Sequence, residues 1–185
     1  MLALESLYNR AFIGECTIGS SRDDRPVLAT DGLNSCIGFS GWNEETTIAF
    51  MVHFYGPKQV DDFFKNGVSL LAKATGSTKS RFKCVLKGGC IKTSSSREIV
   101  ERIKAMCKDS SLIFEITKEY PMSDKIGILK TLSLDTRTGK FGEYNKYEDV
   151  NPMQMSKESE NRENSFDLLE KLIYRYEEKQ SNTSE

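Results

Sequence analysis

The apolar and polar positions along the chain alternate in a way that predicts short strands separated by amphipathic helical segments. Apolar and β-branched residues dominate residues 46–54, which are expected to form the clearest strand. Shorter apolar runs predict further strands over residues 11–18, 27–30, 36–39, 82–86, 112–117, 128–134 and 141–144, the last two as a hairpin. Strands and helices mix without regular βαβ alternation, which favours an α+β fold over a doubly wound sheet.

Two segments in the first two thirds of the chain have helical spacing. Apolar side chains fall on one stripe over residues 58–74, and Gly76 is placed to end that helix. The serines at 94–96 offer N-caps for a second helix that ends at Cys107.

The composition changes after Tyr147. Residues 148–165 are polar and read as a linker, and the apolar positions from Phe166 to Tyr176 predict a short amphipathic helix. We therefore expect one domain over residues 1–147 and a linker with a C-terminal helix over residues 148–185.

Composition and charge narrow the classes of function. The chain has 185 residues and a net charge of −1, which offers no electrostatic argument for binding nucleic acid or a membrane surface. No apolar run is long enough to span a bilayer, and the N-terminus has no secretory pattern, so a cytoplasmic protein is expected. The five cysteines form no CxxC pair and there is one histidine. A disulfide framework and a metal site are therefore not expected, and no cofactor is implied.

Cys36 and His53 are the residues with the strongest candidate chemistry. A thiol becomes a good nucleophile when an imidazole takes its proton, and His53 is the only imidazole in the chain. Cys36 follows a glycine-containing turn, where the backbone amides of Ser35 and Cys36 are candidates for an oxyanion hole. Taken singly, each residue also has a structural interpretation. Cys36 would be a small buried apolar residue and His53 a hydrogen-bonded residue at a strand end.

The spacing of three residues resembles a known family. Thr30 lies six positions before Cys36, and His53 follows 17 positions after it, at the end of a strand. The segment from Thr30 to Cys36 reads T-D-G-L-N-S-C. It resembles the T-x-G-L-G-S-C-like segment of the CheD-type chemoreceptor glutamine deamidases, with Asn34 where glycine is common. A lysine and two glycines after the strand over residues 82–86, and Asp-Thr-x-Thr-Gly in the final hairpin, follow in the family's order.

This resemblance implies a fold, an activity and a set of roles. It implies mixed β-sheets packed face to face and flanked by helices, as in the cytotoxic necrotizing factors and the Burkholderia lethal factor. It implies a Cys–His–Thr triad in which Cys36 attacks a glutamine carboxamide of another protein. His53 would move the proton and Thr30 would orient the imidazole. The implied partners are a chemoreceptor substrate and a chemotaxis regulatory protein, with no metal or cofactor.

Three functions stay open from the sequence, and the first is the chemoreceptor deamidase itself. The second is a secreted toxin of the same fold that deamidates a host protein, because the chain departs from the family after His53, after the double glycine and from residue 151 onward. A non-catalytic binding module that keeps the fold is the third interpretation. Asn34, Gly88 and Gly89 are candidates for substrate contact, although the two glycines are also typical of a simple turn after a strand.

Overall fold

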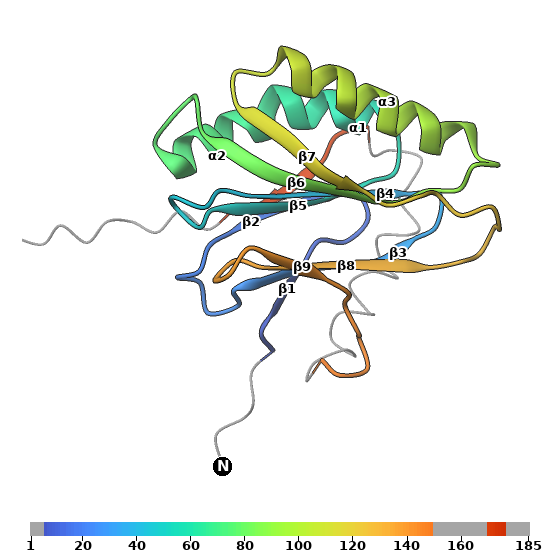
Figure 1. The fold of residues 1–185 in the computed structure, drawn as a ribbon, viewed down its shortest axis with the longest axis horizontal. Helices are drawn as coiled ribbons and strands as arrows, with labels where there is room; N and C mark the ends of the chain where they lie inside the picture. Colours follow the sequence, from blue (N-terminus) through green and yellow to red (C-terminus); the bar gives the residue numbers. More distant parts are fainter. Residues whose placement is uncertain (1–5, 150–169, 177–185) are drawn as a thin grey trace, which may run out of the picture.

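The computed structural model describes residues 6–149 and 170–176, whose strands and helices form three layers (Figure 1). A six-stranded sheet lies in the middle, the helices cover one of its faces, and a four-stranded sheet covers the other. Each sheet contains both parallel and antiparallel pairs. The predicted α+β fold with face-to-face mixed sheets and flanking helices is confirmed.

The six-stranded sheet carries two of the candidate residues. Its strands, in spatial order, are β10 (Ile173–Arg175), β2 (Glu15–Gly19), β5 (Ala49–Phe54), β4 (Ile37–Trp42), β6 (Arg81–Gly88) and β7 (Ile113–Glu119). The turn between β4 and β5 is held by Asn43, whose side-chain oxygen accepts from the Thr46 amide at 2.9 Å. Cys36 directly precedes β4, and His53 is the second-last residue of β5, so this hairpin sets their relative position.

The four-stranded sheet supplies the third candidate, Thr30. Its order is β1 (Tyr8–Arg10), β3 (Val27–Leu33), β8 (Lys130–Asp135) and β9 (Lys140–Gly142). The single strand expected over residues 11–18 is wrong, because the chain changes sheets there. Gly14 turns with φ +74° and its amide donates to the His53 carbonyl at 2.9 Å. The glycine of the turn expected before Cys36, Gly32, lies instead within β3, at an irregularity where its φ is +72°.

Both expected helices are confirmed, but the second runs past Cys107, and its N-cap is Thr93 rather than one of the three serines. The first is a continuous helical stretch made of α1 (Pro57–Asp62), the π-helical segment η1 (Phe63–Gly67) and α2 (Val68–Thr75). Gly76 ends it in the left-handed conformation. The second is α3 (Ser94–Asp109).

Apolar side chains fill both spaces between the layers. The layer between the helices and the six-stranded sheet is built around six phenylalanines, with Phe39 and Phe50 in edge-to-face contact at 5.1 Å between ring centres. The space between the two sheets is filled by smaller side chains, among them Leu33, Met51 and Cys36. Cys36 therefore faces the inter-sheet layer, whereas the next residue, Ile37, faces the helices.

The helix expected over residues 166–176 is wrong over residues 170–176, which contain strand β10 (red in Figure 1). β10 pairs in parallel with β2, and Leu172, Tyr174 and Tyr176 face the helix-covered core at a period of two. The open edge of β2 offers backbone partners that an isolated helical turn lacks, and the Tyr174 hydroxyl also donates to Asp62 at 2.9 Å. Of the linker expected over residues 148–165, only residues 148 and 149 are among the described residues.

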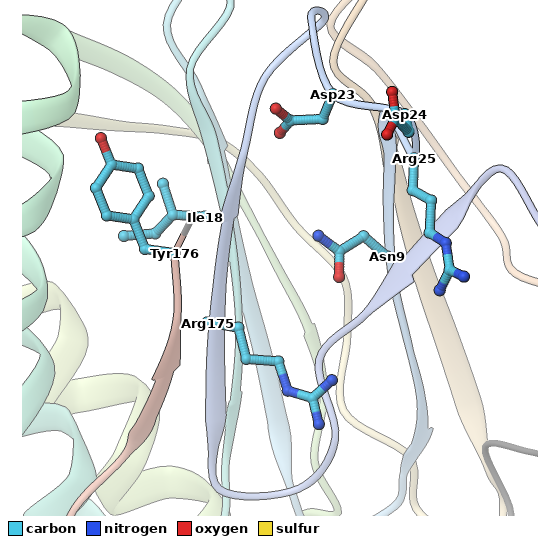
Figure 2. Close-up of a pocket in the computed structure, with 7 residues that line it drawn as sticks. All are labelled: Asn9, Ile18, Asp23, Asp24, Arg25, Arg175 and Tyr176. Atoms are coloured by element: carbon cyan, nitrogen blue, oxygen red, sulfur yellow. The ribbon is translucent and has the colours of Figure 1, made fainter. Parts of the chain in front are cut away.

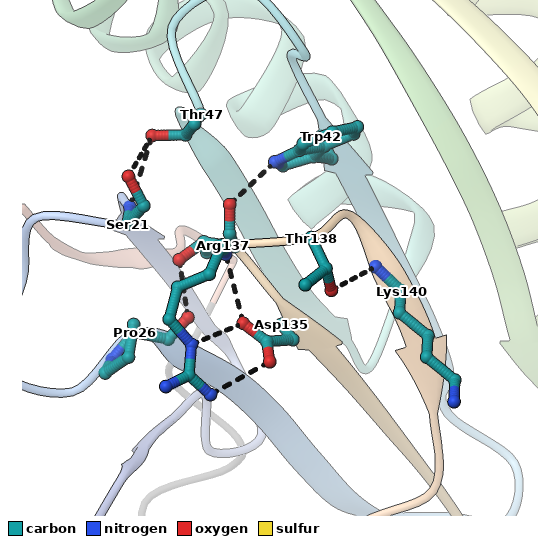
Figure 3. Close-up of polar contacts among 9 residues, drawn as sticks. Ser21, Pro26, Trp42, Thr47, Asp135, Arg137, Thr138 and Lys140 are labelled. Atoms are coloured by element: carbon teal, nitrogen blue, oxygen red, sulfur yellow. Dashed lines mark hydrogen bonds and ion pairs between the residues drawn. The ribbon is translucent and has the colours of Figure 1, made fainter.

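The Asp-Thr-x-Thr-Gly segment of the final hairpin has a structural role (Figure 3). The Thr136 hydroxyl donates to the Pro26 carbonyl at 2.6 Å, and the Thr136 carbonyl accepts from the Trp42 indole at 3.0 Å. Gly139 has φ +72°, and a Cβ there would lie 2.2 Å from the Trp42 ring. Trp42 ends β4 and Cys36 precedes its start, so this motif locks the end of the sandwich that is remote from Cys36.

Candidate functional site

Thr30 and His53 meet in the space between the two sheets. Thr30 projects from β3, His53 projects from β5, and the Thr30 Oγ1 lies 2.8 Å from the His53 Nδ1. Both side chains are buried, with exposures of 0% and 3%. The structure thus brings together two of the three predicted triad residues from different sheets, 23 positions apart in the sequence.

The hydrogen bonds of Thr30 fix the tautomer of His53. The Thr30 hydroxyl donates its one proton to the Ala11 carbonyl at 2.7 Å. It must then accept from the imidazole, so Nδ1 carries the proton and Nε2 presents a lone pair. Nε2 is buried and has no hydrogen-bond partner among the described residues. A buried, unpaired acceptor is costly in a folded protein, and it is the atom that a base needs.

Cys36 lies on the same face of the sheet as His53. Across the β4–β5 hairpin, Ile37 pairs with Phe54 and Gly38 pairs with His53. Cys36 precedes Gly38 by two positions on the same strand, so its side chain and that of His53 are diagonal neighbours on the inter-sheet face. The thiol does not hydrogen-bond to Nε2, which has no partner.

Burial keeps both groups uncharged. It raises the pKa of the Cys36 thiol to about 12, an effect that the Ser35 hydroxyl partly opposes. Burial also lowers the pKa of His53 to about 4, with the Asp31 carboxylate opposing the shift and the Arg10 guanidinium adding to it. At neutral pH the candidate centre is therefore a thiol beside a neutral imidazole, not a preformed ion pair.

Arg10 and Asp31 form a partly buried ion pair beside the centre, which the sequence did not single out. The two are joined at 2.5 Å, and Arg10 also lies over the rings of Phe12 and Tyr144. Asp31 directly follows Thr30 in β3. The only sequence signal was that Asp31 belongs to the motif that contains Thr30.

Gly88 and Gly89 allow close contact with the backbone of Cys36. The Gly89 amide donates to the Cys36 carbonyl at 2.9 Å. Gly88 has φ +111°, and a Cβ there would lie 2.5 Å from the same oxygen. The two glycines thus hold the backbone of Cys36 in place. Asn34 uses its side-chain oxygen to accept from the Gly127 amide at 3.2 Å.

A groove of about 760 Å³ adjoins the segment after Thr30, but none of the predicted site residues lines it. Asp31, Gly32 and Lys87 line it together with Tyr120. Lys87 is only 8% exposed, and its Nζ lies 4.8 Å from the centre of the Tyr120 ring, so this lysine is not freely solvated. A second cavity of about 650 Å³, shown in Figure 2, is lined by other residues, including Asn9, Arg25 and Arg175, and by none of the predicted site residues.

Comparison with known proteins assigns neither a family nor a function to this chain. No protein-family model matches the chain, and no curated protein matches it.

Within residues 6–149 and 170–176, no three histidine, cysteine or acidic side chains are grouped to hold a metal ion. None of the helices in that part of the chain is long and apolar enough to cross a membrane. All five cysteines are free thiols.

The burial of His53 should make folding stability depend on pH between about 6.5 and 4. Its pKa is lower in the folded protein than in the unfolded chain, so the unfolded chain binds the proton more tightly. The free energy of unfolding should therefore fall as the pH falls through this window, by up to about 3 kcal/mol. Urea unfolding at a series of pH values measures the slope.

A His53→Gln variant is the matched control for this pH dependence, because His53 is the only histidine. Carboxylates also titrate toward the acid end of the window, and they do so in both proteins. The difference between the two slopes therefore isolates the imidazole. Equal slopes in the two proteins would show that His53 is not buried as a neutral group.

Proposed function

We propose that this protein is a cysteine-dependent protein-glutamine deamidase. The observation that carries the proposal is the unpaired Nε2 of His53, held as a proton acceptor by Thr30 on the face that Cys36 also occupies. A neutral imidazole with a free lone pair is the form required to take a proton from a neutral thiol. The resemblance to the CheD-type deamidases supplies glutamine as the group attacked.

The proposed reaction uses these three side chains in sequence. His53 Nε2 takes the thiol proton as the Cys36 Sγ attacks the carboxamide carbon of a glutamine. The amides near Ser35 and Cys36 stabilise the negative oxygen of the tetrahedral intermediate. His53 then gives its proton to the departing ammonia, leaving a thioester on Cys36. Water, activated by His53, hydrolyses the thioester to glutamate and restores the thiol.

The burial of the centre supports a large substrate. Cys36 is 5% exposed and His53 is 3% exposed, so part of the surrounding segment has to move to admit a glutamine side chain. Binding of a protein partner is a source of free energy for such a movement. The expected substrate is a chemoreceptor in the cytoplasm, and a host protein is the alternative if the chain acts as a secreted toxin.

The direct test is deamidation of a protein substrate. We expect the purified protein to convert a glutamine in the cytoplasmic domain of a chemoreceptor to glutamate, which peptide mass spectrometry detects as a mass gain of about one dalton. A His53→Ala variant is the negative control. A host-cell extract serves as the second substrate and distinguishes the toxin from the receptor enzyme. Iodoacetamide alkylation of Cys36 is measured in wild type and in His53→Ala. If neither substrate shows a deamidated glutamine and Cys36 is alkylated at the same rate in the two proteins, a binding module is favoured.

A further inference from the structure

Ser96 ties the segment that precedes Cys36 to the first turn of α3. Its side chain is completely buried, and its hydroxyl donates to the Ser35 carbonyl at 2.7 Å. The same oxygen accepts from the Cys90 amide at 3.1 Å. One hydroxyl therefore joins the residue before the candidate nucleophile to the residue after the double glycine.

These contacts go beyond the capping of a helix. The residue at the N-cap position of α3 is Thr93, and its side chain makes no capping hydrogen bond. Ser96 lies three residues further on, inside the helix. Its hydroxyl makes both of its hydrogen bonds to segments outside α3, so it contributes to holding the Cys36 segment.

The orientation of one peptide group follows from the bond to Ser35. The Ser35 carbonyl and the Cys36 amide belong to the same planar trans peptide, so they point in opposite directions. Since Ser96 draws the carbonyl toward α3, the Cys36 N–H points away from α3, and the Cys36 thiol faces the inter-sheet layer. In the part of the chain that the structure describes, the Cys36 amide donates to no backbone or side-chain acceptor outside the strand pairing.

We propose that Ser96 is a positioning residue that orients the Cys36 amide as an oxyanion-hole donor. The proposal rests on the proposed function, because an oxyanion forms only if Cys36 attacks a carbonyl. Ser96 touches no reacting atom itself. It acts by fixing the peptide plane between Ser35 and Cys36, while Gly89 holds the next carbonyl along the chain.

Two reactions of the same thiol separate this role from general support of the fold. Attack of Cys36 on 4-nitrophenyl acetate forms a thioester, releases 4-nitrophenolate and passes through a tetrahedral oxyanion. Attack on iodoacetamide displaces iodide at a saturated carbon and forms no oxyanion. Both need the thiol and its base, but only the first needs the oriented amide.

The experiment measures both rates at Cys36, located by mass spectrometry, in the full chain. We expect Ser96→Ala to lower the acetylation rate about tenfold to a hundredfold, with the alkylation rate unchanged within about twofold. Ser96→Thr keeps the hydroxyl and should restore much of the acetylation rate. Ser94→Ala changes an exposed serine in the same turn and should leave both rates unchanged.

Each other outcome overturns a stated claim. Equal acetylation in Ser96→Ala and wild type, or an equal fall in both reactions, would refute the positioning role and leave the nucleophile in place. If wild type is acetylated at Cys36 no faster than a His53→Ala variant, the proposed function fails and the role of Ser96 fails with it. If Ser96→Ala does not fold, Ser96→Cys fills the site with a slightly larger side chain and a weaker donor, and the same comparison of rates applies.

Discussion

A Cys36→Ser variant should lose deamidation by about 10⁴-fold or more while keeping its fold. A serine hydroxyl is far harder to deprotonate than a thiol, and the buried neutral imidazole is a weak base, with a pKa of about 4. The fold should survive because the new hydroxyl is smaller than the thiol it replaces. Initial rates of ammonia release from a substrate protein measure the loss, and thermal unfolding measures the fold.

The matched control for this substitution is Cys84→Ser. Cys84 is also buried, and its thiol donates to the Phe82 carbonyl, a contact that a hydroxyl can also make. Cys84 lies in the layer between the helices and the sheet, on the face opposite to His53. Its substitution should leave deamidation within about twofold of wild type. Comparable losses from both substitutions would mean that Cys36 is a structural thiol.

A Thr30→Val variant should lower the deamidation rate about 10²- to 10³-fold, the second largest expected effect. Valine has the shape of threonine but offers no acceptor to His53 Nδ1 and no donor to the Ala11 carbonyl. The imidazole can then move its proton to Nε2, where it blocks the uptake of the thiol proton. The two buried groups left unpaired should also lower the free energy of unfolding by about 1–3 kcal/mol.

The tautomer can be observed directly, because the protein has a single histidine. Nitrogen-15 NMR should show a protonated Nδ1 in wild type and in Thr30→Ser, which keeps the hydroxyl, and a mixture of tautomers in Thr30→Val. Activity should follow the tautomer across the three proteins. A Thr30→Val variant that keeps the wild-type tautomer and the wild-type rate would remove Thr30 from the site.

One contact of the candidate site was predicted, whereas several strand boundaries around it were not. The resemblance to the CheD-type family led to the expectation that Thr30 orients His53, and the two side chains are in contact. The break between β1 and β2 was missed because residues 11–18 form one apolar run whether or not the chain changes sheets. The periodicity of apolar residues predicts which face of a strand is buried, but it does not show to which sheet the strand belongs.

Two other features depend on long-range contacts that no local pattern encodes. Ser96 stands in a run of three serines that looks like a helix cap, and its bond to Ser35 joins positions 61 residues apart. The residues of β10 fit a helical stripe and a period of two equally well over so short a span. The open edge of β2 decides between these two structures, and that edge exists only in the folded protein.

The pairing of β10 with β2 also affects how the protein is made. β2 is synthesised well before β10, which is the last of the described strands in chain order. Until β10 is synthesised, β2 presents unpaired backbone groups along an edge of the growing sheet, and such edges pair readily with other chains. We therefore expect the pairing of β10 to reduce aggregation of the growing chain, because it covers an edge of the sheet that carries the candidate centre.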